Sequence, residues 1–239
     1  MNPTQPKLGV AFRDDQLVAI SEVESGLGCG CVCPACGAQL VARKGQIRLH
    51  HFAHHNTAPC EYGVEMIAHL LAKWILEQSM AFTVPPVYAM PGTCLRPYQD
   101  RLLAEVQIER RFGGIVPDIL ARDKDGNSLV IHIRVTHPAD QRKIHQLGEL
   151  GLSAVEVRVP KCDVLSVEQM QKVMTTTTGT KVWLFNMEAA AHRVEHFGSP
   201  DGPGRNYELK ENYYGYFPGG LTCGTQPYSR ASKTVSADS

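Results

Sequence analysis

The chain has 239 residues, of which 43% are hydrophobic, and its 24 basic side chains balance 24 acidic ones. That length and composition suffice for one or two globular domains with an apolar core. The zero net charge excludes the overall positive field of a histone-like polyanion binder, so any nucleic-acid site must be local.

The N-terminal segment and the most apolar stretch both argue for a soluble protein. Charged residues such as Lys7 and Arg13 interrupt the start of the chain, which is untypical of a secretory signal peptide. The apolar stretch 66–76 contains His69 and Lys73 and is shorter than the roughly 18 residues that a membrane span needs. We therefore expect a cytoplasmic protein with no membrane partner.

Short strands are predicted before residue 50 and a long helix after residue 60. Two apolar runs, 9–12 and 16–20, flank a polar turn and predict a hairpin. A second hairpin is predicted over 39–49, followed by a His-rich loop. Apolar residues then recur at i, i+4 and i+8 spacing, which predicts a helix over about 61–80.

Several prolines interrupt the chain after this helix, and the pattern then becomes that of an α/β sheet. The predicted elements are strands at 102–108, 116–122 and 128–136, a helix at 140–150, strands at 154–159 and 181–185, and a helix at 186–194. An Asp-Gly pair marks the turn between the second and third of these strands as a hairpin. Strand, helix and strand in succession predict a crossover.

The composition divides the chain into three parts. We expect an N-terminal module of β-hairpins over 1–60, an α/β domain over 61–197 and a tail over 198–239. The tail is rich in Gly, Pro and Ser and lacks an amphipathic period, which indicates poor order. Five of the eight tyrosines lie in it, so it is also a candidate surface for a protein partner.

Cysteines and histidines cluster in the N-terminal module with the spacing of a zinc site. Cys33-Pro34-Ala35-Cys36-Gly37 is a Cys-x-x-Cys turn, and a second pair of ligands about 20 residues later would complete a tetrahedron. His54 and Cys60 are the preferred second pair. Four protein ligands leave no open position, so the predicted zinc is structural.

Other ligand sets remain open at this stage. His51 is the main competitor for a place in the shell, and Cys29 and Cys31 can substitute if the turn is shifted. A set of buried free thiols without metal is the remaining alternative.

A stripe of polar residues on the predicted helix forms half of a second constellation. Glu65, His69 and Lys73 are spaced by four and therefore share one helix face. Each residue alone is compatible with an ordinary surface or core position.

The predicted hairpin supplies the other half. His132 and Arg134 share one strand face, and Asp118 ends a Pro-Asp pair on the partner strand. Phosphodiester hydrolysis needs oxygen ligands for a divalent ion and a cation beside the attacked phosphate. Glu65 and Asp118 are the candidate ligands for Mg²⁺ or Mn²⁺, and Arg134 or Lys73 is the candidate cation.

Basic side chains in two places are candidates for contact with a DNA backbone, although exposed charges are equally typical of a soluble surface. These residues are Arg43, Lys44, Arg48, Arg110 and Arg111.

Taken in order, the motifs resemble the CoiA-like competence-protein family over roughly residues 8–160. The matching motifs are Cys33-Pro34-Ala35-Cys36-Gly37, His51-Phe52-Ala53-His54, Glu65-x-x-x-His69-x-x-x-Lys73, Pro117-Asp118 and Ile133-x-Val135-Thr136-His137-Pro138. The resemblance implies an N-terminal zinc-binding β module and a PD-(D/E)XK (restriction-endonuclease-like) core, with a mixed sheet flanked by helices. It places Glu65 on the first core helix and Asp118 on the second core strand.

The chain departs from the family pattern on the third core strand. His132-x-Arg134 stands where an acidic residue two positions before Lys or Gln is expected. Three hypotheses follow: His132 binds manganese or another softer ion, Glu156 on the next strand supplies the missing carboxylate, or the site is inactive and the fold binds without catalysis.

The resemblance implies a metal-dependent DNA nuclease in DNA uptake, processing or defence, with DNA as its partner. The alternative is a catalytically inactive nuclease fold that binds DNA or protein. A weaker alternative is a zinc adaptor whose tyrosine-rich tail carries the interaction.

Overall fold

A computed structural model of the chain gives the fold. It describes residues 7–60, 63–90, 93–108, 114–136, 138–159 and 164–197. The candidate residues Arg110 and Arg111, the family-motif residue His137, and the tail over 198–239 lie outside the described residues. No helix among the described residues is both long enough and apolar enough to cross a membrane.

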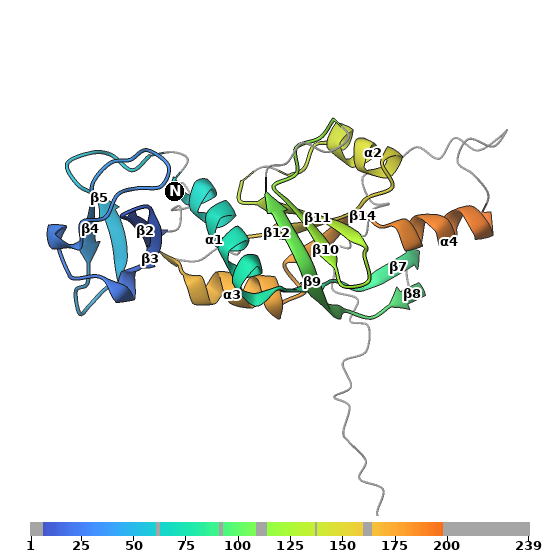
Figure 1. The fold of residues 1–239 in the computed structure, drawn as a ribbon, viewed down its shortest axis with the longest axis horizontal. Helices are drawn as coiled ribbons and strands as arrows, with labels where there is room; N and C mark the ends of the chain where they lie inside the picture. Colours follow the sequence, from blue (N-terminus) through green and yellow to red (C-terminus); the bar gives the residue numbers. More distant parts are fainter. Residues whose placement is uncertain are drawn as a thin grey trace, which may run out of the picture.

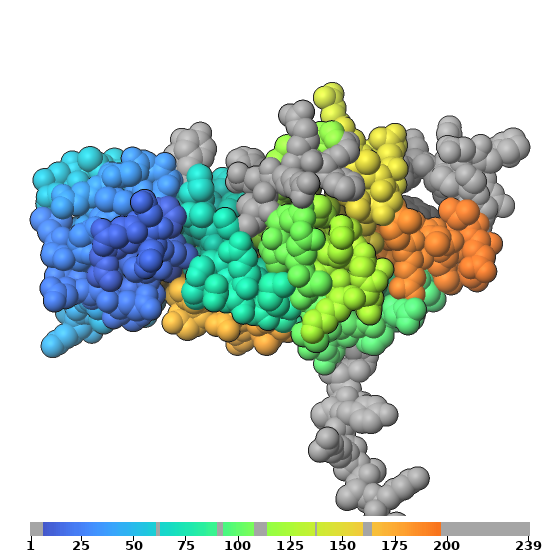
Figure 2. Space-filling model, viewed as in Figure 1, coloured from blue at the N-terminus to red at the C-terminus, as the bar shows by residue number. Residues whose placement is uncertain are grey.

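The N-terminal residues form small antiparallel pairings and two single turns of 3₁₀ helix. The elements are β1 (Lys7–Leu8), β2 (Val10–Arg13), β3 (Gln16–Ala19), η1 (Ile20–Glu22), η2 (Leu27–Cys29), β4 (Leu40–Arg43) and β5 (His51–His54). The predicted first hairpin is confirmed, because β2 pairs with β3 in antiparallel register. In Figure 2 these residues form a lobe beside α1 (Gly63–Ser79).

The second predicted hairpin was wrong in its second strand. β4 pairs with residues 51–54, inside the predicted His-rich loop, and residues 45–50 form an exposed connection instead. Burial explains the difference, because Phe52 is 2% exposed and pairs with Leu8 on one side and Ala42 on the other. Residues 45–48, including the 98% exposed Ile47, have no such core to face.

After α1 the described residues form six successive strands, and helices and strands then follow one another to α4 (Figure 1). After α1 come β6 (Ala81–Val84), β7 (Val87–Met90), β8 (Thr93–Arg96), β9 (Gln99–Ile108), β10 (Ile119–Asp123), β11 (Ser128–Arg134), α2 (Gln141–Glu149), β12 (Ser153–Arg158), β13 (Val164–Leu165), α3 (Val167–Thr175), β14 (Lys181–Phe185) and α4 (Met187–Phe197). The sequence missed β6, β7, β8 and α3. The Pro85-Pro86 pair lies between β6 and β7, where it breaks no ladder.

Six strands form one mixed sheet in the order β14-β12-β11-β10-β9-β6. The predicted hairpin of β10 and β11 and the predicted crossover are both confirmed, because β10 pairs antiparallel to β11 and β11 pairs parallel to β12 across α2. The chain is therefore a mixed α/β protein.

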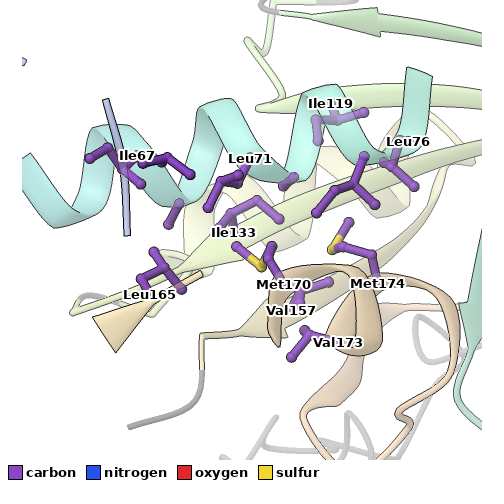
Figure 3. Close-up of a cluster of buried hydrophobic side chains, with 14 of the residues drawn as sticks. Ile67, Leu71, Leu76, Ile119, Ile133, Val157, Leu165, Met170, Val173 and Met174 are labelled. Carbon is purple, nitrogen blue, oxygen red and sulfur yellow. The ribbon is translucent and has the colours of Figure 1, made fainter. Parts of the chain in front are cut away.

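Helices cover the sheet on both faces. Figure 3 shows Ile67, Leu71 and Leu76 of α1 packed over Ile119 and Ile133 of the sheet, with α3 in the same cluster. A second cluster places α2 against the other face, through contacts of its apolar residues Ile144 and Leu147 with Val130, Ala154 and Leu184. This packing on both faces fixes the strands of the sheet, and so it also fixes the polar side chains that those strands carry.

A strand from late in the chain joins the N-terminal lobe to the α/β part. β13 pairs in parallel with β1, and the Gly9 amide donates to the Leu165 carbonyl at 3.0 Å. A Cβ on Gly9 would lie 2.3 Å from that carbonyl oxygen, so only glycine permits the approach. The division of the chain at residue 60 stays a prediction, but the described structure shares a sheet across it.

Candidate functional site

Four potential metal ligands meet between the N-terminal lobe and α1. The ligand atoms of Cys33, Cys36, His54 and Cys60 all lie within 4.8 Å of one another. Sγ of Cys33 lies 3.7 Å from Sγ of Cys60, and Sγ of Cys36 lies 3.3 Å from Nε2 of His54. This Cys₃His cluster can hold a metal ion such as zinc.

The spacing of these atoms suits a tetrahedral ion. Zn–S bonds of about 2.3 Å at tetrahedral angles separate two sulfur atoms by about 3.8 Å. The Cys33–Cys60 separation of 3.7 Å is close to this value without any rearrangement. The residues present therefore fit a structural zinc ion.

A tight turn places the first two thiols. The Gly37 amide donates to the Cys33 carbonyl at 2.8 Å, and Gly37 has a φ of 69°, which glycine adopts without strain. The backbone amide of Ala38 hydrogen-bonds the Cys36 sulfur and lowers the pKa of that thiol. The turn thus favours a thiolate, the form that binds metal.

The Cys60 thiol is hard to deprotonate in the absence of a metal ion. Burial, followed by the neighbouring Cys33 and Cys36 sulfur atoms, raises the pKa of Cys60 to about 12. Three thiolates this close repel one another, so a bound divalent cation is needed to hold all three deprotonated at neutral pH.

The alternative ligands His51, Cys29 and Cys31 contact backbone carbonyls instead of the Cys₃His cluster. Nδ1 of His51 hydrogen-bonds the Leu49 carbonyl at 2.8 Å, and His51 is not part of the cluster. The thiols of Cys29 and Cys31 donate to backbone carbonyls, those of Leu40 and Cys29 respectively.

The first turn of α1 touches this cluster. A Cβ on Gly63, the first residue of α1, would lie 3.1 Å from Sγ of Cys60 and 4.0 Å from Sγ of Cys33. A helix N-terminus favours nearby negative charge, which suits thiolate ligands. The Cys₃His cluster therefore lies against the start of the helix that carries Glu65 and His69.

A second cluster surrounds Asp118, just before β10. Its Oδ2 atom lies 2.7 Å from Nδ1 of His132 and 3.4 Å from Nε2 of His69, and it accepts the Ile133 amide at 2.8 Å. Nζ of Lys143 lies 3.9 Å from the other carboxylate oxygen. One carboxylate, 18% exposed, thus collects groups from α1, β11 and α2.

These contacts fix the charge of Asp118. Burial alone would raise the pKa of Asp118, but the hydrogen bonds from His132 and His69 and the charge of Lys143 outweigh it and hold the pKa well below its usual range. Asp118 is therefore a carboxylate at neutral pH.

His69 is held toward its protonated form. Burial alone would lower the pKa of His69, but the hydrogen bonds to the Asp118 carboxylate and the Glu65 carbonyl raise it above the ordinary value. Nδ1 of His69 lies 2.7 Å from that carbonyl, so both ring nitrogens face acceptors. An imidazolium satisfies both, since it donates from each nitrogen.

His132 presents a different pattern. Its Nδ1 faces the Asp118 carboxylate and so carries a proton, while Nε2 is buried and has no hydrogen-bond partner among the described residues. In this arrangement His132 is a donor that orients Asp118. Manganese binding by His132, as hypothesised from the sequence, would have to use Nε2.

Glu156 is engaged by other groups. It pairs with His132 across β11 and β12 and is 2% exposed. Its Oε1 atom lies 3.1 Å from Arg134 and 3.3 Å from Arg158, and its Oε2 atom accepts the Ala139 amide at 3.2 Å. Both oxygens are therefore occupied, which disfavours the hypothesis that Glu156 replaces the missing acidic ligand.

Glu65 and Lys73 both lie partly buried on α1, as the helix predicted from the sequence implies. Within the described ranges, neither the Glu65 carboxylate nor the Lys73 ammonium has a hydrogen-bond or ion-pair partner, so both remain available to an ion or a ligand. Arg134, by contrast, is committed to Glu156.

Sequence reasoning missed Lys143. A signal for it existed, because the first turn of a crossover helix begins near the carboxyl end of the preceding strand. Lys143 lies in the first turn of α2, and the preceding strand is β11, which carries His132.

The candidate DNA contacts of the N-terminal lobe are of two kinds. Arg43 and Arg48 are exposed, and Arg48 lies in the connection between β4 and β5 beside the 98% exposed Ile47. Nζ of Lys44 instead donates to the carbonyls of Val23 and Ser21 at 2.5 and 3.3 Å. Lys44 therefore holds the lobe together.

Comparison with known proteins bears on the N-terminal part. Residues 26–63 match the family model of the N-terminal domain of the competence protein CoiA. The matched segment contains all four residues of the Cys₃His cluster, and it ends before Asp118. No curated protein and no solved structure matches the chain. The match supports the resemblance over residues 26–63, and the nuclease-like assignment of the remaining chain stays a prediction.

Proposed function

We propose that the protein is a CoiA-like, metal-dependent nuclease that hydrolyses phosphodiester bonds of DNA. The similarity to the CoiA N-terminal domain suggests a competence-associated role, and DNA uptake, processing or defence are the roles that fit it. The observation that carries the proposal is the convergence of His69, His132 and Lys143 on the Asp118 carboxylate at one end of the mixed sheet.

The site residues fit a hard divalent ion. Mg²⁺ is typically bound by one or two carboxylates together with waters and substrate phosphates. Asp118 and Glu65 would hold it, because Oδ1 of Asp118 has only the 3.9 Å contact with Lys143 and Glu65 has no partner among the described residues. Bound Mg²⁺ or Mn²⁺ would supply an activated water and polarise the phosphate.

The protein's own groups orient this site. His132 and the Ile133 amide fix Oδ2 of Asp118, which leaves Oδ1 turned toward Lys143. The sequence offers Arg134 and Lys73 as the cation beside the attacked phosphate. Of the two, Lys73 is free of protein partners within the described ranges, whereas Arg134 pairs with Glu156.

The proposal gives the Cys₃His cluster a structural role. A zinc ion there would hold the first turn of α1 through the contact of Gly63 with Cys60, and so would set the position of Glu65 and His69. It would take no part in the reaction, because its four protein ligands fill the tetrahedral shell.

The test is a cleavage assay on supercoiled and single-stranded DNA with magnesium or manganese. Asp118→Asn is expected to lower the cleavage rate by roughly 100-fold or more. Asp125→Asn is the matched control, because Asp125 is an exposed carboxylate in the β10–β11 turn. Cleavage that survives in the Asp118 variant would overturn the proposed site.

A second candidate function is a nuclease fold that binds DNA or a protein without cutting. It is favoured by the ion pairs of Glu156 and by the three donors on Oδ2 of Asp118, which leave few free carboxylate oxygens for an ion. DNA binding without cleavage in any divalent metal would support this candidate over the first.

A further inference from the structure

Lys143 reaches Asp118 from a helix that the sheet positions. α2 begins after Asp140, whose carboxylate caps the helix by accepting the Lys143 amide at 3.3 Å. Ile144 and Leu147 then anchor α2 on the sheet. With the helix fixed in this way, Nζ of Lys143 lies 3.9 Å from Oδ1 of Asp118 and 3.4 Å from Nδ1 of His132.

Helix stability does not explain a lysine at this position. Cations are disfavoured in the first turn of a helix, because the backbone dipole is positive there. The first turn of α2 has no acidic residue and instead carries Arg142 and Lys143. A negatively charged group opposite α2 explains better why a lysine occupies this position.

The ammonium of Lys143 is open to an anion from solvent. The side chain of Lys143 is 21% exposed and that of Asp118 is 18% exposed, so both can be reached from solvent. Nζ of Lys143 lies 3.9 Å from Oδ1 of Asp118, which is too far for a close hydrogen bond, so the ammonium keeps donors for a further acceptor. These donors suit an anion with oxygen acceptors, such as a phosphodiester.

Arg134 is poorly placed for the same task. Its guanidinium is 3.1 Å from Glu156, which Arg158 also contacts, and breaking such a pair would leave a buried carboxylate short of a partner. Lys143 has no such commitment beyond the Asp118–His132 pair.

We propose that Lys143 is the cation that contacts the scissile phosphodiester at Asp118, in the place for which the sequence offers Arg134 or Lys73. The inference rests on the proposed nuclease function, because the phosphodiester that Lys143 would contact is the substrate of that reaction. The Lys143 ammonium would donate a hydrogen bond to a non-bridging phosphate oxygen. A water oxygen bonds to phosphorus, the bond from phosphorus to the leaving oxygen breaks, and the leaving oxygen receives one proton of the water.

The first test measures binding of the full-length protein to a duplex oligonucleotide over a range of salt concentrations. Each phosphate contact contributes about 0.9 to the slope of log affinity against log salt. Lys143→Met is therefore expected to reduce the slope by about one. Lys172→Met, which removes an exposed lysine on α3, should leave it unchanged. An unchanged slope for Lys143→Met would overturn the inference.

The second test measures cleavage. Lys143→Met should lower kcat by about 100-fold, as loss of a group that stabilises transition-state charge does, and Lys143→Arg should recover part of it. Arg134→Met should lower kcat less than Lys143→Met. The reverse order would assign the role to Arg134. Thermal melting of each variant identifies any loss that comes from unfolding.

The two assays separate this inference from the proposed nuclease function. If the wild type cleaves DNA and Lys143→Met cleaves equally well, the nuclease stands and the role of Lys143 is wrong. If the wild type binds but never cleaves, the nuclease proposal fails, and the salt slope alone decides whether Lys143 contacts phosphate. A wild type that neither binds nor cleaves DNA overturns both.

Discussion

Asp118 and His132 form a direct pair, with Oδ2 of the carboxylate 2.7 Å from Nδ1 of the imidazole. The pair joins the residue just before β10 to β11. His132 stands at the position where the CoiA-like pattern leads one to expect a second carboxylate. His132 thus donates a hydrogen bond to Asp118. An acidic side chain at the same position would instead bind an ion together with Asp118.

Replacing this histidine tests what the position does. His132→Glu places a second carboxylate beside Asp118, which would improve a magnesium site and repel Asp118 without metal. We expect magnesium-dependent cleavage to rise by about 10-fold or more, together with a lower melting temperature in the absence of metal. His145→Glu, at an exposed position on α2, is the control for the cleavage rate alone, because the new carboxylate would face Glu149 one turn later and lower the melting temperature by itself. No gain in cleavage would show that the position does not serve metal binding.

The identity of the histidine in the Cys₃His cluster can be settled by metal analysis. His54→Gln is expected to lose zinc and to unfold at least about 3 kcal/mol more easily, because structural zinc contributes directly to folding. His51→Gln should keep one zinc per chain, since His51 faces the Leu49 carbonyl. Zinc retained by the His54 variant and lost by the His51 variant would reverse the assignment.

The close approach at Gly9 predicts a large effect from one methyl group. Gly9→Ala would place Cβ 2.3 Å from the backbone oxygen of Leu165, so the β1–β13 pairing must shift. We expect a loss of about 1–3 kcal/mol in the free energy of unfolding by urea. Gly45→Ala has open space around it and should be nearly neutral. Equal effects of the two changes would contradict the described pairing.

Lys181 predicts a rise of stability with pH. This lysine is 4% exposed and donates to the carbonyls of Thr83 and Met174. Burial lowers the pKa of Lys181 from 10.5 to about 7, although Asp100 opposes this shift. Between these two values the unfolded chain binds more protons than the folded one, so the contribution of Lys181 to stability increases as the pH rises from 7 to 10.5.

The measurement is urea unfolding of wild type and Lys181→Met at several pH values in this window. The free energy of unfolding of the wild type minus that of the variant should increase by up to ~4 kcal/mol between pH 7 and 10.5. Below pH 7 this difference should be constant. Lys172→Met should show no such change, because its lysine is exposed. A difference independent of pH would contradict the prediction.

Arg43 at the end of β4 and Arg48 in the connection to β5 predict a second DNA contact. Changing both Arg43 and Arg48 to Gln should weaken duplex binding at low salt and reduce the salt slope by up to about two. Lys44→Gln should instead lower the melting temperature, because Lys44 donates to the carbonyls of Ser21 and Val23. A salt slope that is equal in wild type and the double variant would exclude this surface.

Local patterns were enough for the elements that one periodicity or one turn specifies. The apolar repeat predicted α1 to within a few residues, and Asp-Gly predicted the β10–β11 hairpin. The strand over 51–54 was missed because its pairing depends on Leu8, far away in the sequence. α3 was missed although its sequence carries local signals: the buried residues Met170, Val173 and Met174 lie at i, i+3 and i+4, and Ser166 with Gln169 forms a capping box.

The metal cluster was more predictable than the Asp118 cluster. Cys33 and Cys36 are held by one turn, so their spacing alone indicated a pair of ligands. Around Asp118, the sequence identified His69 and His132 as candidate site residues and offered Arg134 or Lys73 for the phosphate. It did not predict their contacts, because alternation along a strand indicates which face a side chain shares and not which neighbour it meets.

By itself, the sequence determined the chemistry that is available: a Cys-x-x-Cys turn with later ligands, a polar stripe on one helix, and an aspartate beside a strand that lacks the expected carboxylate. Only the tertiary structure decided how these groups pair, with Arg134 and Arg158 on Glu156 and Lys143 on Asp118. The reason is physical. Periodicity fixes the direction of a side chain within its own element, whereas an ion pair depends on the register and packing of several elements that come together only when the core forms.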